Sequence, residues 1–309
     1  MAAPPEGTPH HYDRPVESVR LGRSELEVSR VGLGCNNFGR RVDREGTRRV
    51  VDAALDVGIT FFDTAESYGD GDSERYLGAA LGERRGEVVI ATKFGWTAGD
   101  LPGGAPERVR RSIDGSLERL NTNVVDLYYY HRPDGVTPLA ETLGAMQELV
   151  DAGKVRRLGL SNVVVALLEE AEATDVEIVA VQNRYSLINR RDEDGVLPFC
   201  REHGIGYVPY YPLESGLLTG KYRRGEPAPA GSRLSGDGLN DDRLDDVERL
   251  EERAEGAGRP LLELAIGGLA AIDGIASVIA GATTPEQVRA NAAAGAWAPT
   301  PAELERILA

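Results

Sequence analysis

Short apolar runs alternate with amphipathic stretches along most of the chain. Eight runs rich in β-branched and aromatic residues predict strands at 31–34, 59–63, 88–93, 125–130, 155–160, 176–182, 206–210 and 276–280. Apolar residues spaced three or four apart predict helices at 44–57, 73–81, 106–120, 139–151, 163–172, 191–203, 261–272 and 285–294. Strands that alternate with helices in this way predict an α/β fold, a (β/α)8 TIM barrel.

Two segments fall outside this repeat. Residues 18–21 and 26–28 around Gly22 predict an N-terminal β-hairpin that closes the floor of the barrel. The connection 223–258, after the seventh barrel strand, is much longer than an ordinary barrel loop and is rich in Gly, Pro, Asp and Arg. Such loops are usually lids or binding elements, and the Leu, Glu and Arg spacing within 241–255 predicts a surface helix.

Length and composition favour one domain. A chain of 309 residues with 41% hydrophobic content can bury a single barrel core, which we expect at 16–309. Residues 1–15 carry Pro, Gly, His and charge without an apolar run, and predict a flexible tail rather than a signal peptide.

Charge and cysteine content narrow the partners. The net charge is −15 and no block of Lys and Arg occurs, which argues against binding to nucleic acid or to anionic membranes. No segment has 18 or more consecutive apolar residues, so we expect no membrane association. Cys35 and Cys200 are too few for a disulfide framework and favour a reducing, cytoplasmic compartment.

Polar residues follow nearly every apolar run, where barrel active sites are built. Asp63, Lys93 and His131 come at the ends of three such runs, and further runs end in Ser161–Asn162, Gln182 and Tyr210. These side chains are therefore expected to meet at the C-terminal rim of the barrel.

Asp63, Tyr68, Lys93 and His131 suit the reduction of a carbonyl group by hydride transfer. The alkoxide formed by hydride addition needs a proton, and a tyrosine with a pKa of about 10 gives one up only when its phenolate is stabilised. We expect Lys93 to lower the pKa of Tyr68, and Asp63 to keep Lys93 charged and oriented. His131 would hydrogen-bond the carbonyl oxygen or share in proton delivery.

Six segments of the chain are similar to motifs of the aldo-keto reductases. They are 63–69 (DTAESYG), 91–93 (ATK), 130–133 (YHRP), 153–162 (GKVRRLGLSN), 216–222 (GLLTGKY) and 278–291 (VIAGATTPEQVRAN). The resemblance runs from 19 to 294 and is strongest to the branch that contains bacterial reductases and the potassium-channel β subunits. It implies an NAD(P)H-dependent oxidoreductase with Asp63, Tyr68, Lys93 and His131 as its catalytic residues.

The same resemblance implies the residues that bind the cofactor. Ser161, Asn162 and Gln182 would contact the nicotinamide carboxamide, and Tyr210 would stack on the nicotinamide ring. The pyrophosphate would lie along Pro212, Leu213, Gly216, Leu218 and Lys221, and the adenosine half among Gly281, Thr283, Gln287 and Asn291, near a helix N-terminus.

The form of the cofactor depends on the 2′-phosphate. Arg233 stands where relatives carry an arginine for this group, and together with Lys221 it favours NADPH, with NADH as the alternative. Thr283 and Thr284 lack the basic side chain that many members use for the same phosphate. Glu214 stands where relatives have a small residue, and next to a pyrophosphate it would be unfavourable unless it points away.

Phe38, Trp96 and Arg132 follow the first, third and fourth strands, and predict the lining of a substrate pocket, although ordinary loop packing explains them almost as well. Gly32 and Gly34 begin a G-x-G-x-x-G motif, but Asn37 replaces the third glycine, so no Rossmann domain is indicated. No metal site is indicated either, because three of the four histidines lie away from strand ends.

The sequence thus predicts reduction of a small-molecule aldehyde or ketone to an alcohol by NADPH, with Tyr68 as general acid. Two alternatives share these motifs. One is a redox-sensing, NADP-binding regulatory subunit with little turnover, and the other is a biosynthetic ketoreductase for a sugar or natural product. Neither the substrate nor the oligomeric state is encoded in these motifs.

Overall fold

A computed structural model describes residues 16–96, 100–229, 231–234 and 239–309. Its centre is a parallel sheet of eight strands in the order β10-β3-β4-β5-β6-β7-β8-β9. The strands are β3 (Val31–Gly34), β4 (Phe61–Asp63), β5 (Val89–Phe94), β6 (Val125–Tyr130), β7 (Val155–Ser161), β8 (Ile178–Gln182), β9 (Gly206–Tyr207) and β10 (Val278–Gly281).

The two edge strands of this sheet approach each other and close it into a barrel. Tyr207 in β9 forms an isolated parallel bridge with Ile275, and the N–H of Ile279 in β10 donates to the carbonyl of Pro209 at 3.1 Å. The fold is therefore the predicted (β/α)8 barrel. The ladder of β9 ends early because Pro209 has no N–H to donate. Beyond it the predicted strand continues only as an isolated parallel bridge between Tyr210 and Arg184.

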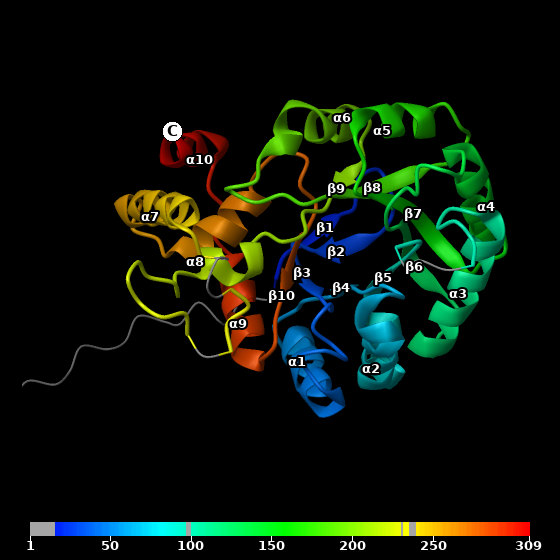
Figure 1. Cartoon of the computed structure of the whole chain (residues 1–309), viewed down its shortest axis with the longest axis horizontal. Helices are drawn as coiled ribbons and strands as arrows, with labels where there is room; N and C mark the ends of the chain where they lie inside the picture. Colours follow the sequence, from blue (N-terminus) through cyan, green and yellow to red (C-terminus); the bar gives the residue numbers. More distant parts are fainter. Residues whose placement is uncertain (1–15, 97–99, 230, 235–238) are drawn as a thin grey trace, which may run out of the picture.

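Helices surround the barrel, as Figure 1 shows. They are α1 (Arg44–Asp56), α2 (Asp72–Leu81), α3 (Pro106–Leu120), α4 (Leu139–Asp151), α5 (Val165–Glu172), α6 (Val196–Glu202), α8 (Leu261–Glu263) and α9 (Pro285–Ala294). Two predicted helices are irregular. The one at 191–203 begins as a 3₁₀ turn, Arg191–Asp194, and restarts after Gly195, and α8 continues as a π-helical turn, Leu264–Gly268.

The predicted hairpin covers the floor of the barrel. Strands β1 (Ser18–Arg20) and β2 (Glu27–Ser29) pair antiparallel, and Leu21, Leu26 and Val28 are buried in one cluster with inward-facing side chains of the barrel. Gly22 has φ +57°, and a Cβ there would lie 2.6 Å from the backbone N of Gly206. The turn thus needs glycine because the hairpin packs directly on the barrel backbone.

Two helices lie on one side of the barrel, next to each other (Figure 1). Helix α7 (Asp241–Gly256) falls in the long connection, as predicted, and is capped by the side chain of Asn240. Helix α10 (Pro301–Leu308) was not predicted; it begins with a capping box between Thr300 and Glu303. Arg253 of α7 donates to the carbonyl of Leu308 at 2.7 Å and joins the two helices.

The predicted tail, residues 1–15, lies outside the described residues. Within the described ranges, no helix is both long enough and apolar enough to cross a membrane.

Candidate active site

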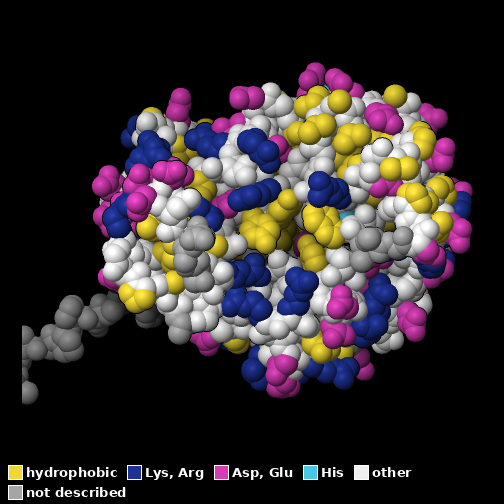
Figure 2. All heavy atoms as spheres, in the orientation of Figure 1, with side chains coloured by type: hydrophobic (Ala, Val, Ile, Leu, Met, Phe, Trp, Pro, Cys, Tyr) yellow, Lys and Arg dark blue, Asp and Glu magenta, His cyan; other side chains and the backbone are white. Residues whose placement is uncertain are grey.

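A cavity of about 820 Å³ opens at the C-terminal ends of the barrel strands. Figure 2 shows the hollow in the middle of this face, with a histidine visible inside it. Its lining includes most of the residues predicted from the sequence: Asp63, Tyr68, Trp96, His131, Ser161, Asn162, Gln182, Tyr210, Pro212, Leu213, Gly216, Lys221, Arg233, Gly281, Thr283, Gln287 and Asn291.

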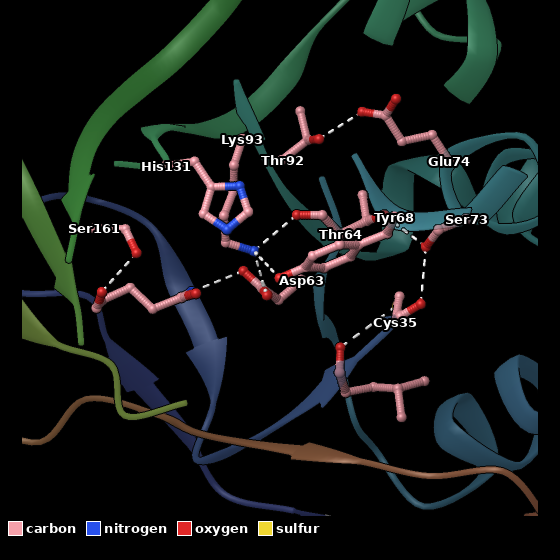
Figure 3. A network of polar contacts seen from close by, with 12 residues as sticks. Cys35, Asp63, Thr64, Tyr68, Ser73, Glu74, Thr92, Lys93, His131 and Ser161 are labelled. Atoms are coloured by element: carbon pink, nitrogen blue, oxygen red, sulfur yellow. Dashed lines mark hydrogen bonds and ion pairs between the residues drawn. The ribbon is translucent and has the colours of Figure 1, made fainter. Parts of the chain in front are cut away.

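Lys93 is fully buried beneath this cavity, and its ammonium has three oxygen neighbours (Figure 3). Nζ lies 2.6 Å from Oδ1 of Asp63, 2.8 Å from the carbonyl of Thr64 and 3.5 Å from the hydroxyl of Tyr68. Asp63 and Lys93 project from the neighbouring strands β4 and β5. Tyr68 begins the 3₁₀ turn η2 (Tyr68–Gly71), which places its ring at the cavity wall.

The pKa values of this group depend on burial and on Asp63. Burial opposes the charged form of Lys93, but the attraction and hydrogen bonds of Asp63 and Tyr68 together outweigh it, and the pKa of Lys93 is raised. Burial also raises the pKa of Tyr68, and Lys93 lowers it by less than burial raises it. Lys93 therefore lowers the pKa of Tyr68, as expected, but the cost of desolvating the phenolate is larger, and the pKa stays above its usual value.

His131 follows β6 and lies beside Tyr68 and Trp96. Its ring meets that of Tyr68 edge-on at 5.8 Å and lies 4.7 Å from that of Trp96, measured between ring centroids. Burial, helped by the nearby charge of Lys93, lowers the pKa of His131 to about 2. The imidazole is therefore neutral at physiological pH, and its buried Nδ1 has no hydrogen-bond partner in the structure.

Asn162 links three strand ends at the rim. It adopts φ +58°, in the left-handed region that asparagine tolerates. Its Nδ2 donates to the carbonyl of His131 at 2.9 Å and to Oγ of Ser161 at 3.1 Å, and its Oδ1 accepts from the hydroxyl of Tyr210 at 2.7 Å. These bonds fix Asn162 relative to the ends of β6, β7 and the segment after β9.

Gln182 extends this network to Asp63. Its Nε2 donates to Oδ2 of Asp63 at 2.8 Å, and its backbone carbonyl accepts from Oγ of Ser161 at 2.7 Å. Hydrogen bonds and backbone connections thus run continuously around the rim from Tyr210 to Lys93.

Glu214 does not point at the predicted pyrophosphate segment. Its side chain is 2% exposed, and its carboxylate accepts hydrogen bonds from Arg184 and from the hydroxyl of Ser186. Arg243 lies 3.7 Å away. The negative charge is neutralised inside the wall of the cavity, which removes the electrostatic conflict seen in the sequence.

Three other predicted residues do not line the cavity. Phe38 and Leu218 are fully buried in the hydrophobic core. Arg132 also lies outside the lining, with its guanidinium stacked 5.4 Å from the ring centroid of Trp96.

The loop after β3 contributes residues that sequence analysis did not select. Asn36, Asn37, Arg40 and Arg41 all line the cavity. Asn37 donates from Nδ2 to the carbonyl of Ala282 at 3.1 Å and accepts, like Asn36, from the guanidinium of Arg233. Their position in the sequence could have indicated this, because they follow the first barrel strand as polar residues follow the other strands.

Residues from distant parts of the chain line this one cavity. They include His131, Gly216, Lys221 and Gln287. Gly216 has φ +92°, and a Cβ there would lie 2.8 Å from Nζ of Lys221, so the missing side chain leaves room for that cation at the cavity. Within the described ranges, no group of three or more His, Cys, Asp or Glu is placed to hold a metal ion.

Comparisons with known proteins give one family. Residues 30–308 match the model of the aldo/keto reductase family. A protein of Glycine max named probable aldo-keto reductase 1 is 38% identical over 78% of this chain and 72% of its own length. A probable voltage-gated potassium channel subunit beta of Oryza sativa is 37% identical over 88% of each chain. The solved structure of aldo-keto reductase AKR11C1 from Bacillus halodurans, a holo form, superposes with a TM-score of 0.82 and 32% identity over 95% of each chain.

Proposed function

This chain belongs to the aldo/keto reductase family, and we propose that it reduces an aldehyde or ketone to an alcohol with NADPH as the hydride donor. The observation that carries the proposal is the position of Tyr68, whose hydroxyl lines the cavity 3.5 Å from the buried ammonium of Lys93. No other described tyrosine has its hydroxyl within hydrogen-bond distance of a lysine ammonium.

Tyr68 would deliver the proton. Its raised pKa keeps the hydroxyl protonated at neutral pH, so a proton is available when the substrate oxygen becomes negative. The phenolate left behind would be stabilised by Lys93, which Asp63 holds charged and in place. The attraction of Lys93 would thus favour the negatively charged phenolate, which forms when Tyr68 gives up its proton.

His131 would orient the substrate. A neutral imidazole at the cavity wall can donate one hydrogen bond to a carbonyl oxygen, and because Nδ1 is buried, Nε2 would be the donor. Since the ring lies against Tyr68, both side chains can reach the same oxygen atom. The low pKa favours this orienting role over that of a cationic acid.

NADPH, when bound, would supply the hydride. Ser161, Asn162 and Gln182 would hold the carboxamide of its nicotinamide, and Tyr210 would pack against the ring. Lys221 would bind the pyrophosphate, while Thr283, Gln287 and Asn291 would surround the adenosine. The fit is supported by the single cavity that these side chains line.

The proposal is tested by turnover with NADPH and 4-nitrobenzaldehyde, followed at the absorbance of the reduced cofactor. Tyr68→Phe should lower kcat at least about a hundredfold, in line with the loss of a general acid, and leave the Kd of NADPH unchanged. Tyr128→Phe is a matched control, because the Tyr128 hydroxyl is buried without a partner away from the cavity. Equal rates in Tyr68→Phe and Tyr128→Phe would refute the role of Tyr68.

A second candidate is an NADP-binding regulatory subunit with little turnover. It is favoured by relatives in Oryza sativa and Arabidopsis thaliana whose names identify probable potassium channel β subunits, 37% and 36% identical to this chain. Negligible turnover over a panel of aldehydes and ketones, together with a partner protein that co-purifies, would rank this function above reduction.

We also propose that the protein works in the cytoplasm, as one domain at 16–309, on a small-molecule carbonyl compound. Cys35 and Cys200 are both buried and free, which suits a reducing compartment.

A further inference from the structure

Arg40 and Arg41 lie on the loop between β3 and α1, and both line the cavity. Thr283, on the loop after β10, lines it as well. Both arginines are exposed, so neither is held in place by packing. Thr283 is one of the residues proposed for the adenosine half of NADPH.

Two loops meet at this end. The bond from Nδ2 of Asn37 to the carbonyl of Ala282 ties the loop after β3 to the loop after β10. A second cavity, of about 440 Å³, adjoins the first, and Arg40, Arg41 and Thr283 line both. Arg49 of α1 also borders this second cavity, but it is paired with Glu45. A group that leaves the main cavity between these loops therefore meets two further guanidinium groups, those of Arg40 and Arg41.

The positive charge of this cluster is not cancelled by carboxylates. Among the described residues, none lies within ion-pairing distance of Arg40 or Arg41, and Arg41 donates only to the carbonyl of Gly231. Arg233 donates to the side-chain oxygens of Asn36 and Asn37, which are neutral. On the neighbouring helix α1, in contrast, Arg48 and Arg49 both pair with Glu45.

The acidic groups nearby are Asp43 and Asp70. Asp43 borders the smaller cavity, but its carboxylate caps α1 by accepting from the N–H of Gly46 at 2.7 Å. Asp70 borders the larger cavity. Figure 2 shows dark blue Lys and Arg side chains gathered beside the hollow, on a protein whose net charge is −15.

We propose that Arg40 and Arg41, together with Arg233, bind the 2′-phosphate of NADPH. This inference rests on the proposed function and names the residues that select its cofactor. A phosphomonoester carries about −1.5 to −2 charges at pH 7 and accepts paired hydrogen bonds from guanidinium groups. These three arginines supply the positive charge that Thr283 and Thr284, on the loop after β10, do not carry. NADPH is then preferred over NADH because NADH leaves the three arginines without an anion.

The test uses two fragments of the cofactor that lack the nicotinamide, 2′,5′-ADP and 5′-ADP, with binding measured by calorimetry. The wild-type protein should bind 2′,5′-ADP about tenfold to a hundredfold more tightly than 5′-ADP. In the double variant Arg40→Gln/Arg41→Gln this preference should fall by about tenfold or more, while the Kd of 5′-ADP changes less than about twofold. Arg41→Lys, which keeps the charge but loses the paired geometry, should give an intermediate preference.

Arg44→Gln is the matched control. It removes one positive charge from an exposed position three residues after Arg41 that lines neither cavity, so it should keep the wild-type preference. A double variant with an unchanged preference, or a wild-type protein without one, would overturn this inference and leave the reductase proposal intact. A wild-type protein that binds neither fragment would overturn the proposed function and this inference with it.

Discussion

The ammonium of Lys93 lies 2.6 Å from Oδ1 of Asp63, with the lysine side chain fully buried and the carboxylate 4% exposed. The other carboxylate oxygen accepts from Gln182 at 2.8 Å. Each charge is therefore compensated by the other, and both oxygens of Asp63 are occupied. Removing one member of such a buried pair leaves the remaining charge without water or counter-ion, which usually costs about 3–5 kcal/mol.

Asp63→Asn should consequently lower the pKa of Lys93, because burial then acts without the opposing attraction. The chain has only three lysines, Lys93, Lys154 and Lys221, so NMR of protein labelled with ¹³C at the lysine ε-carbon resolves each titration. We expect Lys93 to lose its charge at a lower pH in the variant than in the wild type, and kcat to fall with it.

An exposed pair provides the control for this change. Asp114 lies 2.5 Å from Nζ of Lys154, with side chains 61% and 39% exposed. Asp114→Asn should change the free energy of unfolding in urea by about 1 kcal/mol or less, as exposed pairs usually do. The contrary result is that Asp63→Asn changes the free energy of unfolding as little as Asp114→Asn does and leaves the pKa of Lys93 unchanged. That result would show that Asp63 does not compensate the charge of Lys93.

His131 should make stability depend on pH in the acid range. Its pKa falls from the usual 6.5 to about 2 on folding. Between these values the unfolded chain binds a proton that the folded protein excludes, so stability decreases as the pH falls below 6.5. On going from about pH 7.5 to about pH 5, the wild type should lose about 2 kcal/mol more than His131→Gln.

Urea unfolding of both proteins at the two pH values measures this difference. Carboxylates with lowered pKa, such as Asp100 and Asp134, titrate in both proteins and cancel in the comparison. A pH dependence that is identical in wild type and His131→Gln would show that the imidazole of His131 is protonated in the folded state.

The sequence predicted the barrel because alternation of strands and helices is a local signal. Helices α3, α4 and α9 begin and end at the predicted residues. Their apolar residues have helical spacing, and each begins with a Pro or a Leu, so the signal is local. The features that the sequence did not predict depend on tertiary contacts. The ladder of β9 stops at Pro209, and α10 is held by α7 through Arg253, a residue 55 positions from its partner Leu308.

The site was predictable where residues follow strands, and less so where loops meet. Asp63, Lys93 and His131 come together because parallel strands end at one rim, whatever the loops do. The pKa of Tyr68 was not predictable, because it depends on how completely the ring is buried. Glu214 gave a misleading signal, since its partner Arg184 is 30 residues away and no local pattern links the two.

The pair formed by the buried carboxylate of Glu214 and the partly exposed Arg184 should support the wall of the cavity. Glu214→Gln keeps the shape of the side chain but removes the charge that Arg184, Ser186 and Arg243 surround. Because Arg184 is partly exposed and can turn to water, the cost should be about 1–3 kcal/mol of unfolding free energy rather than that of a fully buried charge.

Asp245→Asn is the exposed counterpart of that change. Asp245 pairs with Arg224 on the surface, where its side chain is 60% exposed and Asp241 and Glu248 offer the same guanidinium other partners. Its unfolding free energy should change by less than about 0.5 kcal/mol. Similar losses in both variants would mean that the charge of Glu214 contributes no more than a surface pair.

Gly78 and Gly144 are both helical, but their surroundings differ, and Gly→Ala should therefore have opposite effects at the two positions. A Cβ at Gly78 in α2 would lie 2.3 Å from the carbonyl oxygen of Leu120 at the end of α3. Since that atom is backbone, the two helices must separate, and Gly78→Ala should lower the free energy of unfolding by about 1–3 kcal/mol.

A Cβ at Gly144, exposed on α4, meets nothing within 4 Å. Gly144→Ala should stabilise the protein by about 0.5–1 kcal/mol, because alanine loses less backbone entropy in a helix. Thermal unfolding of the two variants beside the wild type decides the matter: a stabilising Gly78→Ala would contradict the close approach of α2 and α3.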